Sequence, residues 1–415
     1  MNKSLYTFHK HILNVALLLS VTISAFSKTD SVLVRIPVDT TNSKLNMDAT
    51  YDRPFLAVAK TPVAVGGYLE ANSLYGATDG LSEGLSFQAR RLTMFMSSTI
   101  GNNIKFLTEI EFEEGGKAIA IEFAAMDIAI NSAFNLRGGI IMNPIGAFNQ
   151  NHDGPKWEFV ERPDVGVNLL PATWSNAGFG IFGKMNSGNW ILGYELYATN
   201  GFDGSIVDNL ENKTFLPASK PNGARFEESS NGEPLFTGKV AIKNRKIGEI
   251  GFSYMGGVYN VFNPEGVRID KKRRVDVFAI DLNTNIKSSG TYIVGEAVYN
   301  LIDVPDSYTQ QYGNKQWGAF IDVVQPIIKR QMFNWKKASL NVAARFDYVD
   351  WNLETFNETG EKIGDELMAI TPAISFRPST QTVIRLNYRY QLQTDIINNP
   401  AAKTTSWLLG FSTYF

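Results

Sequence analysis

The stretch KTTSWLLGFSTYF, residues 403–415, changes character at every second position. Residues counted back in twos from its end form a mostly apolar face: Phe415, Thr413, Phe411, Leu409 and Trp407. A period of two is that of a β-strand with one face in an apolar environment. A last strand that ends on an aromatic residue is typical of a transmembrane β-barrel, because it closes the cylinder and its end lies in the membrane interface.

The same stretch resembles the C-terminal signal that the outer-membrane assembly machinery of bacteria recognises. The aromatic residues on its apolar face, Trp407, Phe411 and Phe415, are therefore our candidate assembly-signal residues. The signal usually has an aromatic residue third from the end, where this chain has Thr413. We expect the assembly machinery to be a partner of the chain.

The beginning of the chain has the layout of a secretory signal peptide. Residues 1–11 carry Lys3 and Lys10 and no acidic residue, and an apolar run follows over residues 12–26. Small residues at positions 25 and 27 suit cleavage before Lys28. A transmembrane anchor is the alternative, but the run is shorter than the roughly 20 residues that span a bilayer. We therefore predict that residues 1–27 are a signal peptide.

The cysteine count and the net charge exclude several classes of protein. The chain has no cysteine, so it has no disulfide framework and no thiolate metal or redox chemistry. Two of the 39 basic side chains lie in residues 1–27, which leaves 37 against 41 acidic ones and a net charge of −4. A balance this even argues against nucleic-acid binding. We expect no cofactor and no bound metal.

The composition beyond residue 27 indicates strands in a membrane. No long uncharged apolar stretch remains there, so helical membrane spans are not expected. Charged residues make up only 19% of the chain, which is low for a soluble surface. Strands of a lipid-facing barrel alternate apolar and polar residues, so each strand is only moderately hydrophobic. An all-β, antiparallel transmembrane barrel fits this composition.

Several segments show the alternation clearly. In residues 380–392, Ile384 and Leu386 share one face and Arg385 lies on the other, and residues 336–350 repeat the pattern. A soluble β-sandwich also alternates, with its apolar face buried. The segments here are longer than the five or six residues of an average soluble strand. About ten residues of a tilted strand cross a membrane, so the lengths favour a barrel.

The pattern predicts sixteen strands, with fourteen or eighteen as alternatives. Short turns and longer links alternate between them, as expected for periplasmic turns and outer loops. Residues 28–61 then form an N-terminal periplasmic or lumen-mouth segment, and residues 62–415 form the barrel. The expected long links are 76–83, 114–116, 144–176, 200–235, 261–272, 303–314, 351–365 and 393–403, and a longer turn is expected near 329–335. The expected strands are 63–75, 84–98, 103–113, 117–130, 133–143, 177–186, 189–199, 236–245, 248–260, 273–286, 290–302, 315–328, 336–350, 366–377, 380–392 and 404–415.

The link over residues 144–176 is the candidate pore constriction. A sixteen-stranded cylinder is too wide for side chains to fill, and general porins with a similar layout fold their third outer loop inward. Charged side chains in such a constriction set ion preference. The alternatives are a loop packed on the outer rim, or a calcium site formed by Asn149, Asn151 and Asp153. The candidate constriction residues are His152, Asp153, Lys156, Glu158, Glu161, Arg162 and Asp164.

Charged residues of both signs fall on or near the inferred inward faces of the strands. A lumen lined by both signs gives only modest ion selectivity. The alternative is that these residues pair with one another and only keep the wall wet. The candidate pore-wall residues are Arg90, Lys105, Glu109, Glu111, Arg137, Lys239, Arg345, Arg385 and Arg389.

Residues 85–185 carry motifs that resemble one family. The motifs are Arg90-Arg91-Leu92, Asn103-Ile104-Lys105-Phe106, Glu109-Ile110-Glu111-Phe112, Asn135-Leu136-Arg137-Gly138-Gly139, Asn143-Pro144-Ile145-Gly146, Glu161-Arg162-Pro163 and Gly178-Phe179-Gly180-Ile181-Phe182-Gly183. They are similar to the early hairpin, the strand with its P-x-G turn, and the loop-and-return segment of the phosphate-selective porin O/P family. This resemblance implies a sixteen-stranded, usually trimeric outer-membrane channel that prefers anions, whereas the mixed charges above favour weak preference.

We expect a bacterial outer-membrane porin through which small hydrophilic solutes or ions, including anions such as phosphate, diffuse passively. The outer-membrane bilayer is then a partner, and the resemblance implies a homotrimer. A barrel enzyme is disfavoured because His152, the only histidine beyond residue 27, lies in no hydrolase motif. An energised transporter is disfavoured because residues 28–61 are too short for a plug domain. A non-conducting structural or adhesive barrel is the main alternative.

Overall fold

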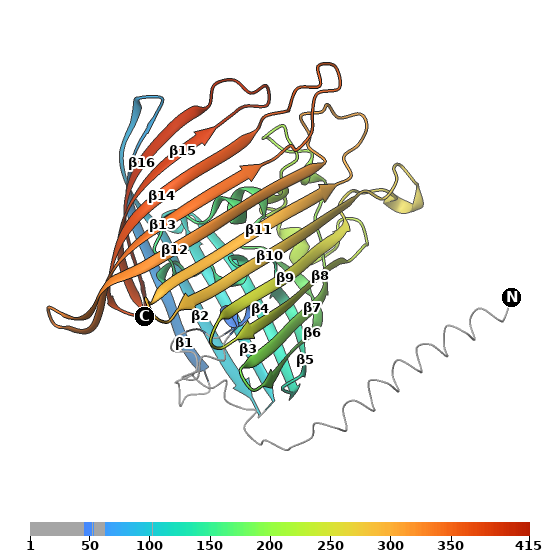
Figure 1. Ribbon diagram of the computed structural model, residues 1–415. Coiled ribbons are helices and arrows are strands. Elements are labelled where there is room, and N and C mark those ends of the chain that lie inside the picture. Colours follow the sequence, from blue (N-terminus) through green and yellow to red (C-terminus); the bar gives the residue numbers. More distant parts are fainter. Residues whose placement is uncertain (1–44, 52, 54–62, 102) are drawn as a thin grey trace. The chain divides into compact units, whose positions relative to one another are not determined.

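The computed structural model describes residues 45–51, 53, 63–101 and 103–415. The predicted signal peptide, residues 1–27, lies outside the described residues and stays a prediction. Sixteen antiparallel strands form one closed barrel, in which β1 pairs with β16 (Figure 1). The predicted fold class and strand number are therefore confirmed.

The strands range from 9 residues in β5 to 20 residues in β2. They are β1 (Val63–Thr78), β2 (Leu81–Ile100), β3 (Ile104–Glu113), β4 (Ala118–Asn131), β5 (Phe134–Met142), β6 (Ser175–Ser187), β7 (Trp190–Thr199), β8 (Leu235–Asn244), β9 (Gly248–Val258), β10 (Arg274–Ile286), β11 (Thr291–Ile302), β12 (Lys315–Met332), β13 (Trp335–Asp350), β14 (Glu366–Ser379), β15 (Thr382–Gln393) and β16 (Ala402–Tyr414). Short helical turns are η1 (Asn46–Asp48), η2 (Glu114–Gly116), η3 (Asn149–Asn151), η4 (Gly154–Lys156), η5 (Val165–Leu169), η6 (Gly204–Ile206), η7 (Leu216–Ser219), η8 (Gly223–Phe226) and η9 (Pro264–Gly266). No helix of the described residues is long and apolar enough to cross a membrane.

Two predicted links are strands in the structure. The expected long link 76–83 is wrong, because β1 and β2 continue to a two-residue turn at Asp79-Gly80. Both turn residues have positive φ, 50° and 85°, which is the geometry of a primed turn that matches strand twist. The longer turn expected near residues 329–335 is also wrong, since β12 and β13 pair up to Met332. A register shift beside Pro326, which has no N–H, lets that pairing continue.

The long links gather at one end of the barrel. Beginning with residues 143–174, every second link is long and the intervening ones are short turns (Figure 1). Transmembrane barrels of this kind have short periplasmic turns and longer outer loops. We therefore call the end with the long links the outer end. The remaining long links are 200–234, 259–273, 303–314, 351–365 and 394–401.

Strands β1 and β16 close the ring through their ends. The Gly67 N–H donates to the Phe415 carbonyl at 3.1 Å, and the Phe415 N–H donates to the Gly67 carbonyl at 3.0 Å. A Cβ at Gly67 would lie 2.1 Å from the Thr93 carbonyl oxygen and 2.6 Å from the Phe415 ring. Only glycine leaves room for the terminal aromatic side chain here. The outward side chains of β16, including Trp407 and Phe411, are exposed, whereas Leu408 and Tyr414 are buried inside.

We expect Gly67→Ala to weaken closure of the barrel. The added methyl group meets a backbone oxygen that cannot move aside, and overpacking of this kind costs about 1–3 kcal/mol or more. The folded band on an unheated gel should convert to the unfolded band at a lower temperature than in the wild type. Gly223→Ala is the control, because a Cβ there meets nothing within 4 Å. Equal transition temperatures for the two variants would contradict this account of closure.

Candidate functional site in the barrel lumen

The link between β5 and β6, residues 143–174, folds into the barrel interior, and we call it the lumen loop (Figure 1). Its backbone N–H groups donate to inward side chains of three strands: Ala147 to Glu296 of β11 at 2.7 Å, Asp164 to Asp347 of β13 at 3.0 Å and Val160 to Asn387 of β15 at 2.6 Å. A loop on the outside of the rim could not reach these side chains. The loop therefore lies across the lumen.

One side of the lumen loop packs as an apolar cluster against the wall. The loop contributes large buried side chains, among them Phe148, Trp157, Val165, Leu169 and Trp174. The wall contributes inward residues of β10 to β13, among them Val275, Val277, Val298, Phe320 and Val349. Apolar contact of this kind excludes water, so this side of the lumen is closed to a hydrated solute. Charged inward faces were predicted from the sequence, and this apolar inward face of the wall was not.

A second outer loop covers the lumen loop. Residues 200–234 place Phe202, Ile206 and Leu216 in the same apolar cluster. The ring of Phe202 stacks on that of Trp174, with centroids 5.0 Å apart and planes 13° apart. The two loops therefore stabilise each other at the outer end of the barrel. The length of the link was predicted, but its contact with the lumen loop was not.

All seven candidate constriction residues lie on the lumen loop inside the barrel. Four acidic ones form ion pairs at 2.6–2.7 Å: Asp153 with Arg53, Glu158 with Arg377, Glu161 with Arg90, and Asp164 with Arg389. The other three contact further groups: Lys156 lies 3.2 Å from Asp153, His152 Nδ1 lies 2.8 Å from the Asn149 carbonyl oxygen, and Arg162 lies over the Phe148 ring and 3.8 Å from Glu111. Their effect on ion preference stays a prediction.

The candidate pore-wall residues point inward, and several anchor the loop. The Lys239 ammonium group donates to the Gly146 carbonyl oxygen at 2.6 Å, and Arg345 donates to the Glu161 carbonyl oxygen at 2.8 Å. Both cations are buried and also pair with wall carboxylates. Among the predicted wall residues, these positions therefore face the loop and not open water. The others with a buried side chain are Glu109, Glu111, Arg137, Arg385 and Arg389.

A β-bulge brings two adjacent arginines to the same face. Glu70 of β1 pairs with Arg91 and the next residue, Ala71, pairs with Ala89, so Arg90 is an extra residue in β2. A bulge of this kind redirects a side chain that alternation would send to the other face. Arg90 forms two hydrogen bonds with Glu161 at 2.9 and 2.7 Å, and Arg91 pairs with Glu70 at 3.0 Å. Sequence alternation alone could place only one of the two arginines inside.

The described part of the N-terminal segment, residues 45–51 and 53, also lies inside the barrel against the lumen loop. The Asn46 N–H donates to Glu249 of β9 at 2.8 Å, and its side-chain amide donates to the Ala147 carbonyl oxygen at 2.7 Å. The Tyr51 ring lies under the Arg137 guanidinium at 3.4 Å. This part of the predicted lumen-mouth segment is therefore a second occupant of the lumen, and none of its residues was among the predicted site residues.

Arg53 is the main contact between this segment, the wall and the loop. Its guanidinium pairs with Asp153 of the loop and with Glu109 of β3, both at 2.7 Å, and it is fully buried. It lies over the Phe95 ring at 4.0 Å from the ring centre. A buried carboxylate is costly unless it is paired, and Arg53 pairs with both of these acids. The sequence around Arg53 does not indicate these partners, because both lie far away along the chain.

The cluster around Arg53 has metal-like spacing but holds its own cation. Ligand atoms of Glu109, His152 and Asp153 lie within 4.8 Å of one another. The Arg53 guanidinium donates to both carboxylates, so it neutralises the charge that would attract a metal ion. The calcium alternative has no support either, since the Asn149 side chain accepts the Trp174 N–H at 2.7 Å and Asp153 pairs with Arg53.

Substitution of Arg53 by alanine is expected to loosen the lumen loop. Loss of one partner of a buried ion pair costs about 3–5 kcal/mol when the other charge stays buried without compensation. Glu109 would lose its arginine in this way, while Lys156 would still lie 3.2 Å from Asp153. Single-channel conductance should then rise and become noisier, with Arg53→Lys in between. Arg245→Ala, in the turn after β8, is the control. A conductance for Arg53→Ala equal to that of the control would show that the segment does not hold the loop.

The charge of Asp153 predicts the pH range in which the loop stays anchored. Burial alone would raise the pKa of Asp153, but Arg53, Lys156 and His152 outweigh it and hold this pKa well below its ordinary value. Because the folded pKa is depressed, the ion pair stabilises the fold above the unfolded pKa of about 3.9 and loses this effect as the pH falls below it. Any difference in conductance between about pH 7 and about pH 5 should therefore be the same in the wild type and in Asp153→Asn. A difference that Asp153→Asn abolishes would contradict this assignment.

The sequence of the chain is similar to that of a bacterial protein over 48% of its length. No family model matches the chain. An uncharacterised protein of Aquifex aeolicus is 31% identical over 211 residues, which cover 48% of this chain and 46% of that protein. The chain thus matches less than half the length of this relative.

Solved structures of outer-membrane porins and channels are similar to the barrel. The anion-selective porin from Comamonas acidovorans is 12% identical, with a TM-score of 0.51 over 85% of this chain and 99% of that one. OprB of Pseudomonas putida is 9% identical, with a TM-score of 0.52 over 85% and 94%. The channel DcaP of Acinetobacter baumannii is 10% identical, with a TM-score of 0.50 over 86% and 99%. At these identities the likeness shows the fold, which is that of a bacterial outer-membrane β-barrel.

Proposed function

We propose that the protein is a porin of the bacterial outer membrane through which small hydrophilic solutes or ions diffuse passively. One observation carries the proposal: a closed sixteen-stranded barrel has charged side chains of both signs inside and a loop held across its lumen. Solved porins share this fold. A structure of OmpT, an outer membrane protein of Vibrio cholerae, is of a trimer form, and we propose a homotrimer here as well.

The solute route, in this proposal, runs past the Arg90–Glu161 pair. The side chains of Arg90 and Glu161 are 21% and 34% exposed, and that of Glu113 on the neighbouring strand β3 is 29% exposed. Most other charged groups inside the barrel are buried, and the lumen loop packs as an apolar cluster against part of β10 to β13. Water and solute therefore have their best access along β2 and β3.

The charges on this route favour weak ion preference. Arg90 faces it, Arg91 and Arg389 lie nearby with side chains only 10% exposed, and each of the three is paired with at least one carboxylate. Paired charges leave little net field to separate anions from cations. An anion preference, including phosphate, would need these arginines to exchange their carboxylate partners for the solute. The anion preference that the family resemblance implies would therefore depend on these arginines alone.

Glu161→Gln tests the route directly. Removal of one negative charge leaves Arg90 without its ion-pair partner and should shift the permeability ratio toward anions, by roughly severalfold at low ionic strength. Reversal potentials in a salt gradient measure the shift. Glu358→Gln, in the exposed outer loop between β13 and β14, is the matched control. If both variants keep the wild-type reversal potential, ions do not pass Glu161.

Deletion of residues 149–162 is expected to raise conductance in planar bilayers. These residues cross the lumen and carry the pairs with Arg53, Arg90 and Arg377. Their loss leaves a wider water-filled cross-section. Deletion of residues 264–270, in the outer link between β9 and β10, is the control. An unchanged step size after the first deletion would place the conducting path elsewhere.

A non-conducting structural or adhesive barrel is the second candidate. The filled lumen favours it, because the lumen loop, the N-terminal segment and residues 200–234 all pack inside or over the barrel. Wild-type protein without conductance steps, with steps only after the loop deletion, would support this reading. An enzyme has less support, since His152 is buried and its ring nitrogens lie at the Asn149 carbonyl oxygen and near Glu109.

A further inference from the structure

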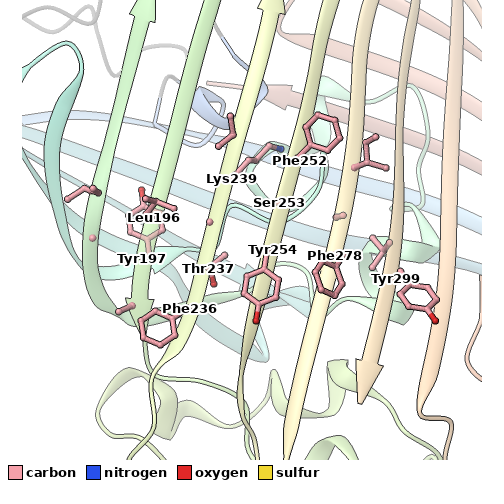
Figure 2. A pocket seen from close by; sticks show the side chains of 18 of the residues that line it. Leu196, Tyr197, Phe236, Thr237, Lys239, Phe252, Ser253, Tyr254, Phe278 and Tyr299 are labelled. Atoms are coloured by element: carbon pink, nitrogen blue, oxygen red, sulfur yellow. The ribbon is translucent and has the colours of Figure 1, made fainter. Parts of the chain in front are cut away.

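A large apolar groove lies on the outside of the barrel wall, away from the lumen. It has a volume of about 1020 Å³ and is lined by residues from β6 to β12. Its outward side chains include those of Leu196, Phe236 and Phe252, which are 48%, 56% and 51% exposed. Figure 2 shows Phe236, Tyr254, Phe278 and Tyr299 on neighbouring strands of this wall. The groove therefore belongs to the surface that faces lipid.

The floor of the groove is low because its outward residues are small. Ala198, Gly238 and Ala297 lie among the lining residues, each next to a larger outward neighbour. One edge is an aromatic row: Tyr254 lies opposite Phe278, Phe278 opposite Tyr299, and Tyr299 opposite Trp317. Aromatic residues of outer-membrane barrels gather at the membrane interfaces. The row thus marks the level at which the apolar band ends.

Charged groups begin directly beyond the aromatic row, toward the outer end. Asp276 points outward two residues before Phe278, and it accepts from the Tyr254 hydroxyl at 2.6 Å and from Arg274 at 2.9 Å. Arg274 is the last of four consecutive basic residues, 271–274. The side chains of Lys271, Lys272 and Arg274 are 52%, 52% and 51% exposed. A rim of half-exposed cations, each paired with a carboxylate, therefore lies at the outer end of an apolar groove.

We propose that this groove binds a phosphate-bearing lipid of the outer leaflet, with an acyl chain over Ala198 and Gly238 and a phosphate at Lys272 and Arg274. Along the groove toward the outer end, an apolar surface is followed by the aromatic row and then by half-exposed cations. The acyl chains, the interfacial part and the phosphate of such a lipid follow one another in the same order. The proposal rests on the outer-membrane location in the proposed function and not on conductance.

The acidic neighbours of the rim do not prevent this binding. Lys272 pairs with Glu233 at 2.5 Å and Lys271 pairs with Asp303 at 3.2 Å, while Arg274 pairs with Asp276. Exposed ion pairs of this kind contribute little. Each ammonium group has three donors and the guanidinium has five, so a phosphate can bind alongside these acids or in place of one. The pairs also hold the cations at the rim before the lipid arrives.

The test measures lipid retention by the full-length, detergent-purified protein in native mass spectrometry. The probe is lipid A with its phosphates, and dephosphorylated lipid A is the second ligand. Wild-type protein should bind the first saturably and the second about tenfold or more weakly. Lys272→Ala with Arg274→Ala should remove the difference between the two lipids. Ala198→Trp, which fills the groove, should weaken binding of both.

Matched controls keep the test decisive. Lys403→Ala removes a cation from the outer end of β16, and Ala344→Trp adds a large outward side chain on β13, both away from the groove. Both should bind as the wild type does, and a heat-modifiable band shows that every variant is folded. Equal retention by groove and control variants overturns the proposal. So does an Ala198→Trp variant that changes the oligomer mass but not lipid retention, because a second copy would then occupy the groove.

Lipid retention is measured without any current through the barrel, so it separates this proposal from the proposed function. A barrel without conductance that retains phosphorylated lipid A would support the groove and reject the porin. A conducting barrel that does not discriminate between the two lipids would reject the groove and leave the porin standing.

Discussion

Backbone N–H and C=O groups that lie in a bilayer need partners within the protein, because the hydrocarbon core offers none. The contact between β1 and β16 meets this requirement, and the reciprocal hydrogen bonds of Gly67 and Phe415 complete it at the end of the chain. Closure also fixes the direction of every side chain, since alternate residues of a strand point to opposite faces. The outside can then be apolar and the inside charged, and the space for the lumen loop exists only because the ring is closed.

The interior uses charge mainly to position backbone. Lys239 and Arg345 each hold a carbonyl oxygen of the lumen loop while a wall carboxylate balances their charge. Arg53 connects the N-terminal segment to the loop and to β3 in the same way. The charged groups that are partly exposed to water lie around Arg90 and Glu161. A wide barrel is thereby narrowed from one side, by an apolar cluster, while the opposite side stays polar.

The strands could be predicted because alternation is a local property that each segment carries by itself. The lumen position of residues 152–164 could be anticipated from link length and charge. The apolar inward face of β10 could not be predicted, because the sequence around Val275 and Val277 is the same whether these side chains face lipid or a loop. Arg53 was also beyond reach, since its partners Asp153 and Glu109 lie far away along the chain. The bulge at Arg90 could not be predicted, because one inserted residue shifts the strand register without changing the composition.

The anchoring of the lumen loop through its carbonyl oxygens has a consequence for its evolution. Every residue type carries a carbonyl group, so the contact of Arg345 with residue 161 places no demand on the side chain there. Residue 146, which Lys239 holds, is different, because a Cβ at this positive-φ glycine would lie 2.2 Å from a Glu296 carboxylate oxygen. Descendants of this sequence can exchange side chains along the loop, and so acquire a different filter, while the wall keeps holding the same path of main chain. These contacts hold the main chain of the loop without depending on most of its side chains, so those side chains can change while the path of the loop stays the same.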